Sequence, residues 1–533
     1  MLLSKNSTKL GTTGVSMEVE LHNGVDRLGD PVAQAVHLRP THHAGIEERF
    51  GPSDLPTGFD ITRNPRIAKL VGNRKFQFLL ILPNQIIFWT VIFVGLLGTA
   101  IPGLNFGAAI TWYVWFCLVF VMMVVAGRAW CAMCPFGGFA EWIQRRTFWQ
   151  RTQKTLGLGR KFPEPLAKIG FILPVGSFLV LTWIEEYYGI AGPGNPAATS
   201  LMVIGIVLSA LVFFMVFERR TFCRYICPLT SLIGTVGSMG SVAGFRTRDR
   251  DHCLSCATKD CMRGGDDGYG CPWYTWPGSA DSNLYCGLCT ECFKSCPDDN
   301  VGLFLQKPFT SVVAPTRRRA DVAWAIVLLW GLVLYQQLNY FPSYASFDGW
   351  LNAHMGIPRY PNPVAYLVVI AAGTLLIAGA AWAIGFLVAR RDLVLDQPGN
   401  FIERRSRFRT FFIPIAYGLI PIVGADYFAR QLPKFFQYAP RVVPSIGNMF
   451  GVAGVHSPLY NTRLLTDPHI IIVQVAVVAL GTVGALWATW KITNRELVAV
   501  SRNITVLRIT ALSLVLACGA AAALLYIPMS AAD

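Results

Sequence analysis

The chain has 533 residues, of which 53% are hydrophobic and only 14% are charged, and its mean hydropathy is +0.43. Soluble globular domains carry roughly 25% charged residues, so this composition excludes an ordinary soluble enzyme or binding module. The formal net charge is +15. A nucleic-acid-binding protein would carry a basic soluble face with interleaved aromatic residues, and the sequence shows none, so we expect no nucleic-acid partner.

Long apolar segments dominate the sequence. Each is about twenty residues long, the length that a helix needs to cross a bilayer. They predict an all-α polytopic membrane protein with about nine transmembrane helices, near residues 76–100, 107–127, 166–185, 200–217, 320–340, 363–388, 409–427, 468–490 and 506–528. We expect four parts: a polar N-terminal segment, a four-helix membrane domain, an insert and a five-helix membrane domain, at residues 1–70, 71–245, 246–310 and 311–533.

Basic residues alternate between the loops. The loop 128–168 carries eight Lys and Arg residues, whereas the next loop, "EYYGIAGPGNPAATS", has none. Lys and Arg concentrate in cytoplasmic loops of membrane proteins. The alternation therefore predicts a multi-pass protein of the bacterial cytoplasmic (inner) membrane, with the N-terminus and the insert in the cytoplasm and the C-terminus on the periplasmic side.

The fourteen cysteines fall into three groups. Cys117 and Cys518 lie within predicted helices, where we expect them to be small packing residues. The other twelve lie in or beside predicted inside loops, a reducing compartment that favours metal binding over disulfides. Eight of these belong to the insert, and the remaining four follow two membrane helices.

The insert carries a regular cysteine ladder, "CGLCTECFKSCPDDN", after an earlier "CLSCATKDC" and a "CPW". Three closely spaced thiolates can hold three irons of one cubane, while the distal cysteine before a proline reaches the other cluster. This logic predicts two [4Fe–4S] clusters, one on Cys253, Cys256, Cys261 and Cys296, and one on Cys286, Cys289, Cys292 and Cys271. Zinc is the alternative, but it prefers two CxxC pairs separated by a longer loop. The long CxxxxC spacing leaves the assignment of Cys271 open.

Two further motifs repeat 92 residues apart, "RAWCAMCPF" with Cys131 and Cys134, and "RTFCRYICPL" with Cys223 and Cys227. Each follows a pair of predicted helices, which indicates a duplicated unit of the kind that builds many membrane proteins. All four thiols fall at the inner surface, where they could share a metal ion or a third cluster. In the alternative, the prolines only terminate helices and the cysteines are structural.

Paired CxxxCP motifs after membrane helices, followed by a two-cluster insert, resemble a membrane-bound 4Fe–4S ferredoxin-type family. It includes the quinol dehydrogenase membrane subunit of periplasmic nitrate reductase, nitrous-oxide-reductase regulator and electron-donor proteins, and cbb-type oxidase accessory proteins. The resemblance covers about residues 70–310, although the first motif here is CxxCP. It implies membrane electron transfer, often linked to quinol, with the clusters on the cytoplasmic side.

We therefore expect electrons to pass between the quinone pool or a cytosolic donor and a partner oxidoreductase or cytochrome subunit, as in a quinol dehydrogenase complex. The alternatives are a copper reductase or assembly factor for a respiratory oxidase, and a redox sensor without turnover. Candidate quinone or proton sites are Gln85, beside a proline in the first helix, and the paired Glu185 and Glu186. We expect no haem, because no histidine lies in the middle of a predicted helix.

Overall fold

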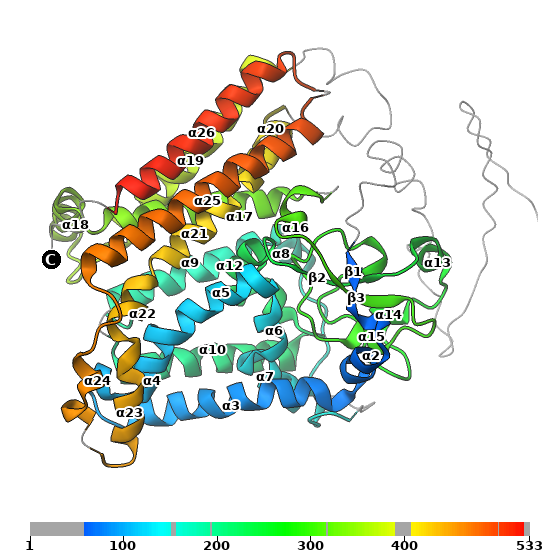
Figure 1. Ribbon diagram of the computed structural model, residues 1–533, viewed down its shortest axis with the longest axis horizontal. Helices are drawn as coiled ribbons and strands as arrows, with labels where there is room; N and C mark the ends of the chain where they lie inside the picture. Colours follow the sequence, from blue (N-terminus) through cyan, green and yellow to red (C-terminus); the bar gives the residue numbers. More distant parts are fainter. Residues whose placement is uncertain are drawn as a thin grey trace, which may run out of the picture. The chain divides into compact units, whose positions relative to one another are not determined.

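The computed structural model describes residues 58–150, 156–191, 194–315, 318–389, 407–452, 454–498 and 500–526. The chain divides into units at residues 1–53 and 54–533, and all of these residues belong to the second unit. Most of the predicted N-terminal segment and the C-terminal end therefore lie outside the described residues. Helices dominate the described chain, and one small sheet lies with the insert at one end of them (Figure 1).

The first repeat begins with the apolar helix α3 (Arg74–Leu97), which Asn73 caps by accepting a hydrogen bond from the Lys75 N–H. The elements α4, η5 and α5 then run without a break from Phe106 to Ala126. Gly127 ends this helix at φ +63°, where a Cβ would lie 2.9 Å from the Asn283 amide nitrogen. The close approach therefore requires glycine. The bounds are α4 Phe106–Ala109, η5 Ile110–Trp115, α5 Phe116–Ala126, α6 Ala129–Met133 and α7 Pro135–Arg145.

The second repeat has the same order of elements. Pro135 and Pro228, the prolines of the two motifs, each stand at the first position of a short helix. A proline fits there because that N–H has no partner within a helix, so each proline begins a helix. Helix α7 packs on α3 and α10, and α12 packs on α9 and α5. The elements are α8 Glu164–Ile169, α9 Ile172–Tyr187, α10 Pro196–Val216, α11 Thr221–Tyr225 and α12 Pro228–Gly237.

The insert is closed by a three-stranded antiparallel sheet in the order β1–β3–β2. Strands β2 (Val242–Thr247) and β3 (Val301–Leu305) bracket the eight cysteines, and β1 (Phe59–Asp60) comes from the chain before α3. An ion pair of 2.8 Å joins Arg248 Nε to Asp60 Oδ2 across this sheet. The shorter elements are η3 Ile61–Arg63, α2 Pro65–Gly72, α13 Arg250–Ser255, α14 Asp260–Arg263, η6 Pro277–Ser279 and α15 Glu291–Lys294.

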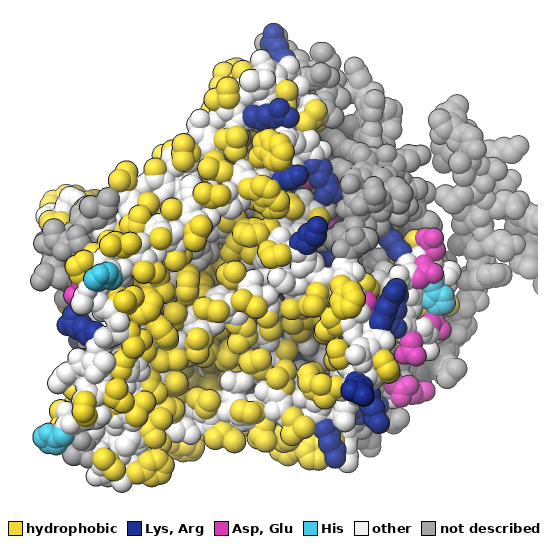
Figure 2. All heavy atoms as spheres, in the orientation of Figure 1, with side chains coloured by type: hydrophobic (Ala, Val, Ile, Leu, Met, Phe, Trp, Pro, Cys, Tyr) yellow, Lys and Arg dark blue, Asp and Glu magenta, His cyan; other side chains and the backbone are white. Residues whose placement is uncertain are grey.

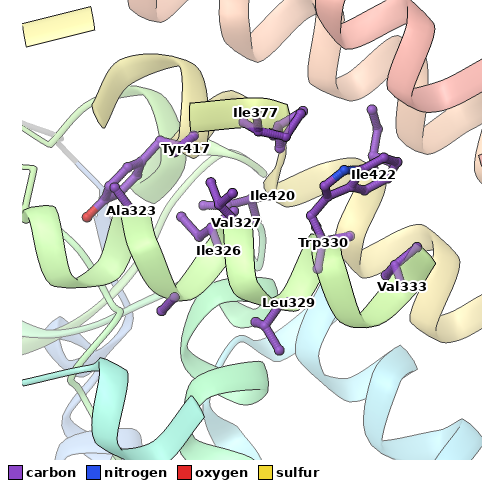
Figure 3. Packing of buried hydrophobic residues seen from close by; sticks show 14 of the residues in the cluster. Ala323, Ile326, Val327, Leu329, Trp330, Val333, Ile377, Tyr417, Ile420 and Ile422 are labelled. Atoms are coloured by element: carbon purple, nitrogen blue, oxygen red, sulfur yellow. The ribbon is translucent and has the colours of Figure 1, made fainter. Parts of the chain in front are cut away.

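The remaining helices pack around α17 (Ala320–Leu338). Figure 3 shows Val327 and Trp330 of this helix among Ile377, Tyr417 and Ile420 of the helices around it. All five side chains are buried. The other elements are α16 Thr310–Val313, α18 Pro342–Met355, α19 Pro363–Val388, α20 Arg407–Gly418, α21 Ile420–Ala429, α22 Leu432–Tyr438, α23 Val442–Met449, α24 Pro458–Asn461, α25 Asp467–Glu496 and α26 Ile504–Leu524, with 3-10 turns η4 Pro102–Leu104, η8 Ala439–Arg441 and η9 Gly454–His456.

Within the described ranges, eight helical stretches are long and apolar enough to cross a membrane. They match the predicted segments except that near 166–185, where α9 has 16 residues. The count of nine is therefore not confirmed, whereas a predominantly helical, apolar fold is. Many large apolar side chains point outward, as Leu97 and Leu480 do, and Figure 2 shows them covering most of one helical face. Such a surface suits a lipid environment.

Candidate metal centres

Four cysteines of the insert line one cavity, which we call the first insert site: Cys253, Cys256, Cys261 and Cys296. Helices α13 and α14 and the turn after α15 supply them. The Asn300 side-chain amide donates to Cys253 Sγ (3.4 Å), and its backbone N–H donates to Cys296 Sγ (3.3 Å). These hydrogen-bond donors face sulfur, so they would stabilise thiolates there.

A lysine and a tryptophan also line this cavity, as do Asp260 and Asp298. Lys259 Nζ donates to the carbonyls of Cys253 (2.9 Å) and Cys256 (3.0 Å) and lies 4.8 Å from the ring centroid of Trp276. The loop between the two cysteines is thereby held by a cation. The first insert site thus combines four sulfurs, a positive charge and a ring that shields one side.

Four further cysteines of the insert, Cys271, Cys286, Cys289 and Cys292, are near neighbours, because the first three are close enough to act on the charge of Cys292. We call this predicted set the second insert site. The backbone N–H of Phe245 donates to Cys286 Sγ (3.4 Å), and that of Thr275 donates to Cys271 Sγ (3.3 Å). Burial, and then the neighbouring thiols, raise the pKa of Cys292 well above its ordinary value. Because metal ligation requires thiolates, a positive metal centre would be needed to keep this buried set deprotonated.

The membrane motifs bring their four cysteines to a third site, a cavity lined by Cys131, Cys134, Cys223 and Cys227. Each repeat supplies one pair of cysteines. The two pairs meet because α7 of the first repeat packs on α10 of the second, and α12 of the second packs on α5 of the first. Burial, followed by the nearby Cys227, raises the pKa of Cys134 to about 12. Most of the remaining wall is apolar, so this site also favours neutral thiols unless a metal binds.

Two buried arginines adjoin the third site, and neither was predicted from the sequence as a site residue. Arg128 and Arg220 each stand three residues before the first cysteine of a motif, and each is 1% exposed. Arg128 Nη2 lies 3.8 Å from Cys131 Sγ, and Arg220 donates to the Cys131 carbonyl at 3.4 Å. The signal in the sequence was the repeated R-x-x-C spacing.

The third site and the second insert site are neighbours. Trp273, two residues after Cys271, lines the third-site cavity and is 1% exposed. The guanidinium of Arg128 lies 4.4 Å from its ring centroid. Burial opposes the charge of Arg220, but Glu141 and then Cys223 and Cys289 raise its pKa. Arg220 is therefore close to cysteines of both sites.

The residues present fit clusters better than single ions. In the part of the chain that the structure describes, no three His, Cys, Asp or Glu side chains are grouped closely enough to hold one metal ion. A tetrahedral zinc site, with zinc–sulfur bonds of about 2.3 Å, would hold its sulfurs within about 4 Å of one another. The first insert site and the third site instead each place four sulfurs around a cavity, as a multi-iron cluster needs.

The three candidate quinone or proton residues lie in two places, Gln85 in α3 and the paired glutamates in α9. The Gln85 amide, oriented to satisfy both partners, donates to the Pro135 carbonyl (3.1 Å) and accepts from Trp89 Nε1 (2.9 Å). Glu186 accepts a hydrogen bond from the Tyr335 hydroxyl at the C-terminal end of α9, next to Glu185. Phe171, at the other end of α9, packs against Tyr285 of the insert, so these carboxylates lie about 20 Å away along the helix.

A protein-family model described as a 4Fe–4S binding domain matches residues 108–155 and 199–243. The two matched segments contain Cys131, Cys134, Cys223 and Cys227 and none of the insert cysteines. No curated protein and no solved structure matches the chain. The match supports an iron–sulfur protein of ferredoxin type, and it falls on the two repeats that form the third site.

Proposed function

We propose that the chain is a membrane-bound iron–sulfur electron-transfer protein that holds three [4Fe–4S] clusters, one at each site. The ligands would be Cys253, Cys256, Cys261 and Cys296; Cys271, Cys286, Cys289 and Cys292; and Cys131, Cys134, Cys223 and Cys227. One observation carries the proposal: the four cysteines of the two repeats line one cavity, and both repeats match a 4Fe–4S binding model.

When bound, such clusters supply one-electron transfer, and the chain provides ligands, burial and charge. Cysteines from all three sites belong to one buried cluster of side chains, which also contains Trp273. This packing places side chains of all three sites in one continuous buried cluster. The arginines Arg128 and Arg220 place positive charge beside the third site, which favours the reduced, more negative state.

The proposed surroundings follow from the distribution of charge. Figure 2 shows Lys and Arg side chains gathered toward the end that adjoins the insert, as a cytoplasmic surface would have. We therefore place the three sites at the cytoplasmic side of a bacterial inner membrane and the C-terminus at the periplasmic side. By resemblance to quinol dehydrogenase subunits, the exchange partners would be the quinone pool or a cytosolic donor, and an oxidoreductase or cytochrome subunit.

The test uses anaerobically purified protein with dithionite, a quinol and Cu²⁺ as alternative reactants, monitored by absorbance and EPR. Reduction of bound clusters by dithionite and by quinol supports the respiratory function. Cys134→Ser should retain the insert clusters and lose exchange with quinol, whereas Cys117→Ser, a change at a packing cysteine, should behave as the wild type. Stoichiometric copper bound at the third site, with no iron there, would instead indicate the metal-reductase function.

A further inference from the structure

A further pocket, which we call the interface cavity, lies where the first residues of α3 meet the end of α7 and the insert. Its charged lining residues are Arg74, Glu141, Arg145, Asp267, Glu291 and Lys294. Helix α3 is a candidate membrane span that begins at Arg74. The cavity therefore lies at the end of a span, beside the insert.

The charges of this lining balance. Among the described lining residues, three are basic and three are acidic. Arg74 donates to the backbone carbonyl of Asp267 (2.9 Å), and the other four form ion pairs. Arg145 contacts Glu141 (2.6 Å) and Glu291 (3.7 Å), and Lys294 contacts Glu291 (3.5 Å). A bound anion would meet carboxylates and a bound cation would meet guanidinium groups. A neutral ligand with hydrogen-bonding oxygens suits this wall best, because it neither adds nor removes a charge.

Aromatic side chains form another part of the lining. The Phe78 ring lies 5.3 Å from Trp142, 5.4 Å from Phe148 and 5.0 Å from Trp149, centroid to centroid. Phe148 is 58% exposed and Trp149 is 38% exposed. Aromatic side chains of this kind collect at membrane–water interfaces. A planar ring that reaches the cavity from the lipid phase would stack against this wall.

The interface cavity also adjoins two of the cysteine sites. The Gln77 amide, oriented to satisfy both partners, donates to the Cys289 carbonyl (3.2 Å) and accepts from Arg220 (3.0 Å). Glu141 pairs with Arg220, which lines the third-site cavity. Glu291 directly precedes Cys292 and accepts the Tyr269 N–H at 3.0 Å. A ligand here would be one side chain away from the second insert site and from the third site.

We propose that the interface cavity binds the headgroup of a membrane quinone or quinol, a neutral planar ring with two oxygen functions and an apolar tail. The inference rests on the proposed function, in which a quinone is the lipid-soluble exchange partner, and it assigns that quinone a binding site. The earlier candidate residues fit such a ligand less well, because the Gln85 amide is already bonded to Pro135 and Trp89, and Glu185 and Glu186 lie at the far end of α9. The interface cavity thus unites the aromatic wall, the balanced polar wall and the nearby cysteines.

The test measures quinone binding and not turnover. Thr147 lines the cavity, so Thr147→Trp fills it with a ring, and Trp142→Leu removes part of the aromatic wall. Leu158→Trp adds the same ring at a position that is 65% exposed and serves as the matched control. Oxidised holoprotein of each variant is equilibrated in nanodiscs with menadione and with decylubiquinone, and the bound quinone is extracted and quantified.

Both cavity variants should retain at least tenfold less quinone than the wild type, with unchanged iron content, and Leu158→Trp should bind normally. Equal quinone retention in all variants would overturn the site while leaving the proposed function intact. Specific retention of phosphatidylglycerol without quinone would overturn the ligand class. If the wild-type protein binds quinone but holds no iron, the proposed iron–sulfur function is wrong, whereas the quinone site in the cavity is supported. If Thr147→Trp does not fold, Trp142→Leu decides.

Discussion

Removing the charge of Arg128 should lower the reduction potential of a cluster at the third site. Arg128 Nη2 is 3.8 Å from Cys131 Sγ, and the side chain is 1% exposed. Reduction adds one negative charge to the cluster, which a fixed neighbouring cation stabilises. Arg128→Gln keeps a polar side chain of similar length and deletes that cation, so the reduced state loses its stabilisation.

The size of the effect follows from the distance. The added electron spreads over the irons, about 7 Å from the guanidinium, and an effective dielectric constant of about 20 gives about 2 kcal/mol. A tenfold change in a one-electron equilibrium corresponds to 59 mV, so this energy corresponds to a decrease of about 100 mV. Arg220 remains in the variant, so the third site keeps one of its two cations.

The assay is an EPR-monitored redox titration of anaerobically purified protein. Arg128→Lys retains the charge but not the planar group over Trp273, and its potential should stay close to the wild-type value. Lys168→Gln deletes a cation from a pair with Glu164 whose side chains are 73% and 79% exposed, and solvent should screen it. An unchanged potential in Arg128→Gln, or an equal shift in Lys168→Gln, would refute the electrostatic reasoning.

Two further predictions concern stability and topology. Glu141→Gln leaves the buried Arg220 without its carboxylate partner and should lower the free energy of unfolding by about 3–5 kcal/mol. The loss is measured by thermal and denaturant unfolding at pH 7. Glu164→Gln, which removes the carboxylate of an exposed pair, is the control. Burial opposes the charge of Glu141, but Arg145 and Arg220 lower its pKa from the ordinary value of 4.5. Its contribution to stability should therefore be fully present above that value and disappear at lower pH. A Glu141→Gln protein as stable as the wild type would contradict this. Reporter fusions after Arg250 and after Asp533 should read opposite sides of the membrane, and two identical readings would contradict the proposed orientation.

Features that depend on local spacing could be predicted from the sequence. Apolar length anticipated eight of the membrane helices, because a spanning helix needs about twenty apolar residues. The segment near 166–185 was harder, since Gly170 adopts φ +64° and separates α8 from α9. The CxxCxxC spacing indicated iron–sulfur chemistry, which the family match supports, although that match falls on the membrane motifs and not on the ladder.

Features that depend on distant segments could not be predicted. Strand β1 has only two residues, and its partner β3 follows more than 240 positions later, so no periodicity signals it. In the sequence, Arg128 is only one of the basic residues that predict the membrane orientation. A buried arginine is unusual and is recognised by its three-dimensional neighbours. The interface cavity is formed by α3, α7 and insert loops together, and none of these segments carries a motif for it.

The most direct test of the central claim is the iron and acid-labile sulfide content of anaerobically prepared, ⁵⁷Fe-enriched protein, with Mössbauer spectroscopy to identify the cluster type. Three cubane clusters require about 12 iron per chain, and Cys227→Ser should reduce this to about 8. Cys117→Ser, at a buried cysteine outside the three sites, should leave the content unchanged. Stoichiometric zinc without iron, or a Cys227→Ser protein with the full iron content, would contradict the account.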